Sequence, residues 1–224
     1  MLAINIQKTL HGSQGQMQLA VKLDIEEGSF TVIMGKSGSG KTTLLRILAG
    51  LEKSEGDIVV DGKSWKGLPP QQRKIGFVFQ DYALFEHMSV EENLLFMKND
   101  KALAKELLAK TELSLLASRN VKNLSGGQKQ RVSLCRAMMN QPKLLLMDEP
   151  LSSLDEEMRV KLIEEIEKLH THFGTTTLMV SHDANASYAL ADRVILLEQG
   201  KIIKDGTKEQ VLEEKTTVTY ALKR

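Results

Sequence analysis

Hydrophobic and polar residues follow two different periods along this chain. Alternation at every second residue predicts strands at 2–9 and 17–25, and the turn residues "HGSQG" between them indicate an antiparallel hairpin. Mostly apolar runs, typical of buried strands, occur at 30–34, 75–79 and 143–148, and two further strands are predicted at 56–62 and 176–181. Helical spacing or composition predicts helices at 41–50, from Ser125 onward and at 156–172. Strands and helices therefore alternate, which is typical of an α/β fold.

A helical interval from Ser89 to about Ser118 interrupts this alternation. Ser89 is followed by Glu92, the spacing of a capping box, and a second helical segment follows at 101–110. Near the end of the sequence, a hairpin turned at Gln199 and Gly200 precedes a short helix near 207–213. The pattern predicts an α/β core with a helical insertion.

Composition narrows the class of protein. Among 224 residues, 42% are hydrophobic and 26% are charged, which is typical of a globular protein. Lys and Arg total 30 against 29 Asp and Glu, so no basic excess suggests a nucleic-acid partner. The single Cys135 excludes an internal disulfide. No signal peptide and no apolar stretch of membrane-spanning length is found, so we expect any membrane role to depend on a partner.

The segment "GKSGSGKT" at 35–42 fits the P-loop pattern and lies between a predicted strand and a predicted helix. Glycines allow the backbone angles that turn successive N–H groups toward phosphates. Lys41 supplies a positive charge to the β- and γ-phosphates of a nucleotide, and Thr42 offers a hydroxyl to Mg²⁺. These residues predict a nucleotide site.

The buried strand predicted at 143–148 ends in Asp148, and a second acid, Glu149, follows it. Asp148 is suited to hold the Mg²⁺ shared with Thr42. Glu149 then remains to orient or deprotonate an attacking water. The sequence therefore predicts nucleotide hydrolysis.

A second anion site is predicted at "NLSGGQ". Ser125 begins a helix whose first turn contains Gly126 and Gly127, and free N–H groups at a helix start attract anions. One chain with a P-loop has no evident use for a second phosphate site.

Together these motifs resemble the nucleotide-binding subunit of ATP-binding cassette (ABC) transporters. They occur in the family's order: the P-loop, or Walker A motif, Gln80 in "FVFQD", "LSGGQ", "LLLMDEP", "SSLD" and His182 in "VSHD". The resemblance covers essentially the whole chain. It implies a P-loop NTPase core, with a mainly parallel sheet and helices on both faces, plus an N-terminal hairpin. It also implies one ABC ATPase domain over 1–224, with core at about 1–81 and 137–224, a helical signature subdomain at 82–136 and no C-terminal regulatory domain.

The resemblance also answers the question of the second site. In this family two copies pair head to tail, so the signature helix of one copy meets the ATP of the other. It implies that Gln80 contacts Mg²⁺ and the attacking water, that Asp155 links the two sites and that His182 contacts the γ-phosphate. The implied ATP-binding residues are Gly35, Lys36, Ser37, Gly38, Ser39, Gly40, Lys41, Thr42, Thr43, Ser125, Gly126, Gly127, Gln128 and Asp155.

The first hairpin departs from the family's pattern. Residues 3–29 contain no aromatic residue to stack on adenine, which leaves His11 as the nearest candidate and predicts modest discrimination between ATP and GTP.

The segment "PPQQRKIGFVFQDYALFEHMSVEENL" resembles molybdate and sulfate importers, and molybdate is the predicted cargo. The resemblance implies a permease subunit, an extracytoplasmic binding protein and a peripheral location on the cytoplasmic face of the inner membrane. An exporter or lipoprotein-release ATPase and a soluble non-transport ABC ATPase are the alternatives.

Overall fold

A computed structural model describes residues 1–12 and 15–212. The chain divides into two compact units by its backbone contacts. The first consists of residues 1–73 and those from 176 onward, and the second of residues 74–175. Residues 82–136, the helical signature subdomain that the resemblance implies, fall within the second unit.

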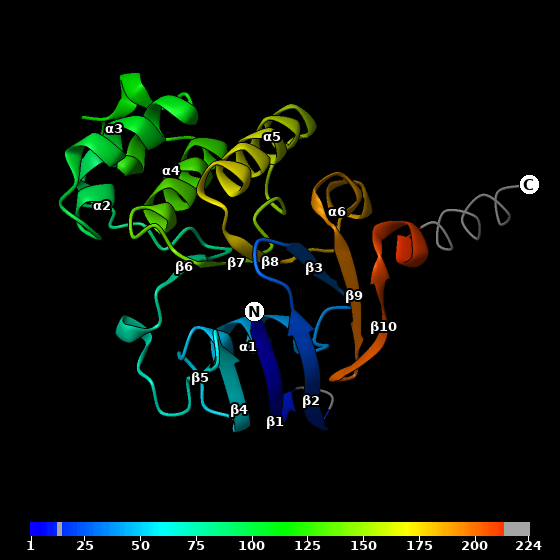
Figure 1. Ribbon diagram of the computed structural model, residues 1–224. Coiled ribbons are helices and arrows are strands. Elements are labelled where there is room, and N and C mark those ends of the chain that lie inside the picture. The colour runs from blue at the N-terminus through cyan, green and yellow to red at the C-terminus, as the bar shows by residue number, and fades with distance from the viewer. Residues whose placement is uncertain (13–14, 213–224) are drawn as a thin grey trace, which may run out of the picture. The chain divides into compact units, whose positions relative to one another are not determined.

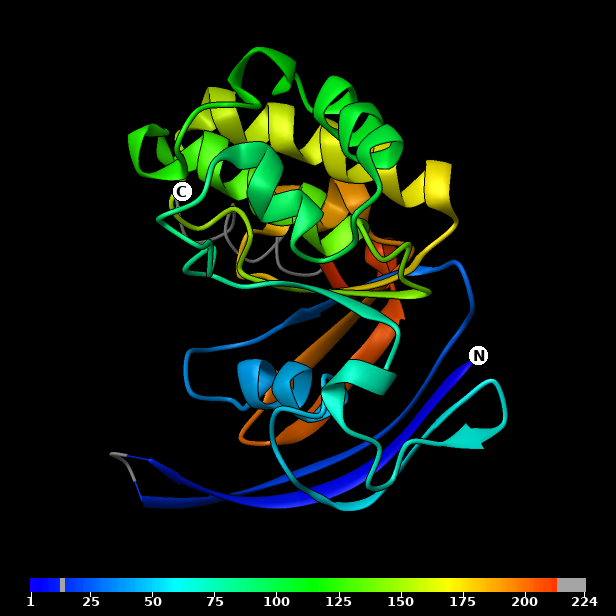
Figure 2. The same cartoon turned by 90° about the vertical axis from the view of Figure 1, so that its left-hand side faces the viewer.

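The first unit begins with the predicted hairpin, whose strands are β1 (Leu2–Gly12) and β2 (Gly15–Ile25). Apolar residues at alternate positions, such as Ile4 and Ile6, are buried, while Asn5 between them is exposed. The structure adds what the pattern left open: β4 (Glu55–Val60) pairs antiparallel with β1, and the short β5 (Lys63–Ser64) follows. The hairpin is therefore part of a four-stranded antiparallel sheet in the order β2-β1-β4-β5 (Figure 1). Figure 2 shows the same hairpin, in blue, from another side.

A second group of strands in the first unit carries the glycine-rich loop. Fully buried β3 (Phe30–Met34) lies between β8 (Thr176–Val180) and β9 (Arg193–Glu198), parallel to both. The predicted terminal hairpin joins β9 to β10 (Lys201–Thr207), and Gln199 and Gly200 at its turn both have positive φ, 46° and 77°.

The helices of the first unit include two that follow parallel strands. Helix α1 (Lys41–Leu48) begins at the glycine-rich loop and ends before Gly50, whose φ of 75° fits a helix C-terminus. Helix α6 (Ala184–Leu190), which the pattern did not predict, follows β8. Residues 208–212 are also helical, so the described part of the predicted last helix is confirmed.

The second unit contains a parallel strand pair, β6 (Ile75–Val78) and β7 (Leu144–Asp148), and a group of helices (Figure 1). The helices are α2 (Val90–Leu95), α3 (Lys101–Lys110), α4 (Gly126–Met138) and α5 (Glu156–Phe173). Short 3₁₀ turns lie at Ser114–Leu116 and Val121–Asn123, and one at Pro70–Gln72 belongs to the first unit. Helix α4 packs against α2, α3, α5 and β6.

Each of the four helices of the second unit begins at a side chain that accepts a backbone N–H. Ser89 with Glu92 and Ser125 with Gln128 form complete capping boxes, and Asp100 and Asp155 cap α3 and α5. These contacts satisfy amides that have no partner within the helix. The starts of α2 and α4 could be predicted because a capping box has a fixed spacing of residue types in the sequence.

The interior of the second unit also holds polar groups. Arg131 of α4 and Glu165 of α5 form an ion pair of 3.1 Å, and each is less than 10% exposed. Cys135 is buried beside Thr111, 3.1 Å from its hydroxyl oxygen, and burial raises the pKa of the thiol to about 12. The thiol is therefore protonated at neutral pH, as expected for a structural cysteine.

No helix within residues 1–12 and 15–212 is both long and apolar enough to cross a membrane.

Candidate nucleotide-binding site

The glycine-rich loop begins directly after β3, at the carboxyl end of a buried parallel strand. Gly35, Gly38 and Gly40 have φ angles of 154°, 79° and 100°, values that L side chains rarely adopt. A Cβ on Gly35 would lie 2.1 Å from the carbonyl oxygen of Leu197, so this position also requires glycine for space.

Helix α1 starts without a side-chain cap. Its N-cap is Gly40 in the left-handed region, which has no side chain to accept the first N–H groups, and no acidic residue lies in its first turn. Such a helix start presents N–H groups and the positive end of the helix dipole to an anion.

Lys41 brings a positive charge to the same loop. Its Nζ donates to the carbonyl oxygens of Gly35 and Lys36 at 2.8 and 2.9 Å, and the residue is only 8% exposed. The ammonium is therefore fixed against the loop backbone, where it meets any phosphate that the loop amides bind.

The other P-loop side chains differ in exposure. The buried Ser39 hydroxyl has no hydrogen-bond partner in the structure, so it is a polar group that a ligand could satisfy. Thr42 and Ser37 are exposed, and Thr43 is half-buried.

His182 shares a sheet edge with the P-loop. In the parallel register Ile33 pairs with Val180, so the segments that follow β3 and β8 leave the sheet at the same end. His182 is exposed there, two residues beyond β8. The structure thus brings these two sequence-predicted elements to one edge of the first unit.

Gln80, Asp148 and Glu149 share an edge in the second unit. Val78 of β6 pairs with Met147 of β7, so these strands end side by side. Asp148 is the last residue of β7, Glu149 follows it, and Gln80 lies two residues beyond β6. Gln80 is exposed, whereas Asp148 is only 5% exposed. Glu149 has a φ of 47°, and its carbonyl oxygen accepts bonds from the amide and hydroxyl of Ser152. A non-glycine residue held in this conformation at a strand end is typical of a functional site.

The signature segment forms a regular helix start. Ser125 Oγ accepts the amide of Gln128, and Gln128 Oε1 accepts the amide of Ser125. Gly126 and Gly127 occupy the first two helical positions, whose amides have no acceptor within the helix. The predicted helix start at Ser125 is confirmed. The side chains of Ser125 and Gln128 each accept the other residue's backbone amide.

A comparison with protein-family models now decides the class. Residues 19–152 match the model described as "ABC transporter", which is more than half of the chain. The chain belongs to the ABC transporter family. The predicted resemblance is therefore confirmed.

Two curated relatives of the ABC family are each 44% identical to this chain. One is the spermidine/putrescine import ATP-binding protein PotA of Thermotoga maritima, matched over 90% of this chain and 57% of the relative. The other is the sulfate/thiosulfate import ATP-binding protein CysA 2 of Agrobacterium fabrum, matched over 87% of this chain and 60% of the relative. The chain thus spans less than two thirds of the length of these relatives.

A solved ABC cassette has the same fold. The dimeric, post-hydrolysis structure of the ATP-binding cassette MJ0796, bound to ADP and Pi, is 33% identical to this chain. It matches with a TM-score of 0.81 over 93% of this chain and 99% of the other. The predicted ABC ATPase fold is therefore confirmed.

Asp155 has a local role that the motif did not predict. Its carboxylate accepts the amide of Met158 at 2.9 Å and so caps α5. The implied link between two ATP sites stays a prediction, as do the other site roles and the division into ABC subdomains.

His11 is exposed on β1. The nearest heavy atoms to a Cβ built on Gly40 belong instead to Leu10, Met17 and Leu19, at 3.0 to 3.6 Å. The surroundings of the P-loop are therefore apolar but not aromatic on this side, and adenine contact by His11 stays a prediction.

Sequence reasoning did not predict the backbone conformation of the loop that follows Gln80. Tyr82 and Ala83 both have positive φ, 63° and 47°, and their carbonyl oxygens accept bonds from α4. Neither residue type signals a left-handed conformation, so no local signal could have found this loop.

Proposed function

We propose that this chain is the ATP-binding and ATP-hydrolysing subunit of an ABC import system. The P-loop carries the proposal: it combines glycine-dependent backbone angles, an uncapped helix start and a buried lysine whose ammonium lies against the loop. Both curated relatives are import ATP-binding proteins by name, which supports an importer over the exporter and non-transport alternatives.

The residues present fit ATP with Mg²⁺. Within residues 1–12 and 15–212, no group of three or more His, Cys, Asp or Glu residues could hold a metal alone. Mg²⁺ in phosphotransfer sites is held by one or two protein oxygens together with substrate phosphates. Thr42 and Asp148 would supply such oxygens, and Gln80 would be a further ligand. Bound Mg²⁺ would neutralise charge that develops on the phosphates.

Hydrolysis is assigned to three side chains. Glu149 would take a proton from the attacking water, Gln80 would orient that water, and His182 would contact the γ-phosphate. His182 lies at the same sheet edge as the P-loop in the first unit, and Gln80 and Glu149 lie beyond neighbouring strand ends in the second, which supports these roles.

The signature helix completes the proposed site of a second copy. Ser125, Gly126, Gly127 and Gln128 form a helix start with two free amide positions, which suits a γ-phosphate presented from outside the chain. ATP would therefore join two copies head to tail, and hydrolysis would release them.

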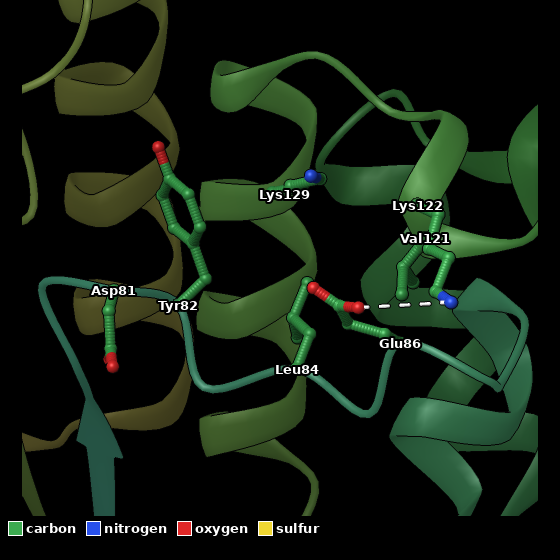
Figure 3. A pocket seen from close by; sticks show the side chains of 7 residues that line it. All are labelled: Asp81, Tyr82, Leu84, Glu86, Val121, Lys122 and Lys129. Carbon is green, nitrogen blue, oxygen red and sulfur yellow. Dashed lines mark ion pairs between the residues drawn. The ribbon is translucent and has the colours of Figure 1, made fainter.

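A permease is the proposed membrane partner. An open surface pocket in the second unit could receive a permease segment (Figure 3). It is lined by Asp81, Tyr82, Leu84, Glu86, Val121, Lys122 and Lys129. Glu86 and Lys122 lie 3.9 Å apart at this pocket, and both are exposed. A surface with both charge signs and apolar residues suits a polar protein segment better than a lipid. The subunit would act at the cytoplasmic face of the inner membrane, with an extracytoplasmic receptor on the other side.

The proposed cargo is a small inorganic oxyanion such as molybdate. One relative is named for sulfate and thiosulfate, which are oxyanions, and the other for spermidine and putrescine, which are cations. The cassette does not determine this choice, because cargo is selected by the membrane subunits.

The test is purification of the tagged chain from gently solubilised host membranes, with mass spectrometry of its partners. An integral subunit with an extracytoplasmic receptor supports the importer. The reconstituted complex should then hydrolyse ATP faster with molybdate than with sulfate or spermidine. Recovery of soluble partners alone would contradict transport, and stimulation by spermidine would contradict the oxyanion.

A further inference from the structure

Tyr82 lies in one segment that carries proposed functional residues and contacts two others. It lies two residues after Gln80, its hydroxyl is 3.0 Å from the Oγ of Ser153, and its ring runs beside α4 (Figure 3). Ser153 lies between Glu149 and Asp155. One side chain thus joins the loop after Gln80 to the segment after Glu149.

The backbone at Tyr82 is fixed by α4. The carbonyl oxygen of Tyr82 accepts from Ser133 Oγ at 3.0 Å and from Arg136 Nη2 at 3.1 Å. Arg136 Nη1 also donates to the carbonyl oxygen of Ala83 at 2.6 Å. Two consecutive non-glycine residues with positive φ are unfavourable in isolation, so these bonds to a buried helix maintain the conformation.

The side chain extends toward the start of the same helix. A Cβ built on Gly126 would lie 3.2 Å from the Tyr82 hydroxyl. Ser133 and Gly126 are separated by about 10 Å along a helix that rises about 1.5 Å per residue. Tyr82 therefore spans two turns of α4, with its backbone bonded at one end and its hydroxyl against the signature glycine at the other.

We propose that Tyr82 is a positioning residue, which couples the loop after Gln80 to the signature start of α4 and to the segment 149–155 through its hydroxyl. This inference rests on the proposed ATPase function. A displacement of the loop would move a rigid ring, and the Ser153 bond would pass that displacement to the segment that follows Glu149. A side chain at Gly126 would crowd the Tyr82 hydroxyl, so glycine at this position allows the close approach.

The hydroxyl can be tested separately from the ring. Tyr82→Phe keeps the packing and removes the bond, and Ser153→Ala removes the same bond from the other side. Each variant should lower kcat about two- to tenfold, with ATP affinity and melting temperature unchanged. The double variant should be no slower than either single variant, because both remove one interaction.

Two further variants serve as controls. Ser153→Thr retains a hydroxyl and should keep the wild-type kcat. Tyr188→Phe removes an exposed hydroxyl from α6 in the first unit and should also have no effect.

The outcomes separate the two proposals. Wild-type kcat in Tyr82→Phe, or additive losses in the double variant, would contradict the coupling while the ATPase function stands. An inactive wild-type protein would contradict the ATPase function, and this inference with it.

Discussion

The starts of α1 and α4 are both glycine-rich helix N-termini, yet they are built in different ways. At α1 the N-cap is Gly40, with no side chain to accept the first amides, and Lys41 supplies a charge beside them. At α4, Ser125 and Gln128 close a capping box, and only Gly126 and Gly127 keep open amides. The first start is organised to bind an anion alone. At the second, two of the backbone amides already have acceptors in the capping box. It therefore suits a weaker phosphate contact than the P-loop makes, one that forms only when a second copy presents its ATP.

The largest expected effect is on the ATPase rate of a variant that binds ATP but does not hydrolyse it. Glu149→Gln removes the proposed base and should lower the ATPase rate about 10²- to 10⁴-fold, while the P-loop still binds ATP. The trapped ATP state should form a stable dimer, detected by light scattering. Glu167→Gln makes the same chemical change at an exposed position of α5 and should leave the ATPase rate and the dimer unchanged. Turnover near the wild-type rate would refute Glu149 as the base.

The next effect should distinguish the two helix starts directly. Lys41→Ala removes the charge beside α1 and should weaken ATP binding by the isolated chain about 10- to 100-fold, measured by calorimetry. Ser125→Ala should leave this affinity unchanged, because the signature start acts only in the dimer. Lys63→Ala, on exposed β5, is the charge-matched control. Equal losses in Lys41→Ala and Ser125→Ala would show that both helix starts bind the ATP of the same chain.

Arg131 of α4 and Glu165 of α5 form a buried ion pair. We expect this pair to make the free energy of unfolding depend on pH. Burial raises the pKa of Glu165 to about 7 from an ordinary 4.5, and the charge of Arg131 opposes that shift. Because the folded state holds this proton more tightly than the unfolded state, the free energy of unfolding falls as pH rises from 4.5 to 7.

Urea unfolding across this pH range measures the contribution. Relative to Glu165→Gln, the wild-type protein should lose on the order of 2 kcal/mol of unfolding free energy between pH 4.5 and 7. Glu167→Gln, on the exposed face of α5, should behave like the wild type. Parallel pH profiles for the wild type and Glu165→Gln would contradict the raised pKa.

The smallest expected effect compares two capping boxes in the same unit. Ser89→Ala and Ser125→Ala each remove an N-cap hydroxyl and should each cost about 1 kcal/mol in unfolding free energy. Only Ser125→Ala should also weaken the ATP-dependent dimer in a Glu149→Gln background. If both variants affect the dimer equally, the start of α4 has only a structural role.

The sequence by itself determined most local structure and the identity of the motifs. Glycine at 35, 38 and 40, serine before α2 and α4, and the uninterrupted apolar run of β7 act through backbone angles, caps and burial over a few residues. Such short-range requirements leave a readable pattern. The family resemblance followed from the order of these motifs.

Only the tertiary structure decided which distant segments meet. The pairing of β4 with β1, the Arg131–Glu165 ion pair, and the contacts of Tyr82 with Ser153 and α4 join residues far apart in the chain. The left-handed backbone of Tyr82 and Ala83 is held by side chains of Ser133 and Arg136, about 50 residues away, so no local preference encodes it. Long-range bonds of this kind depend on how helices pack, which residue type and spacing do not specify.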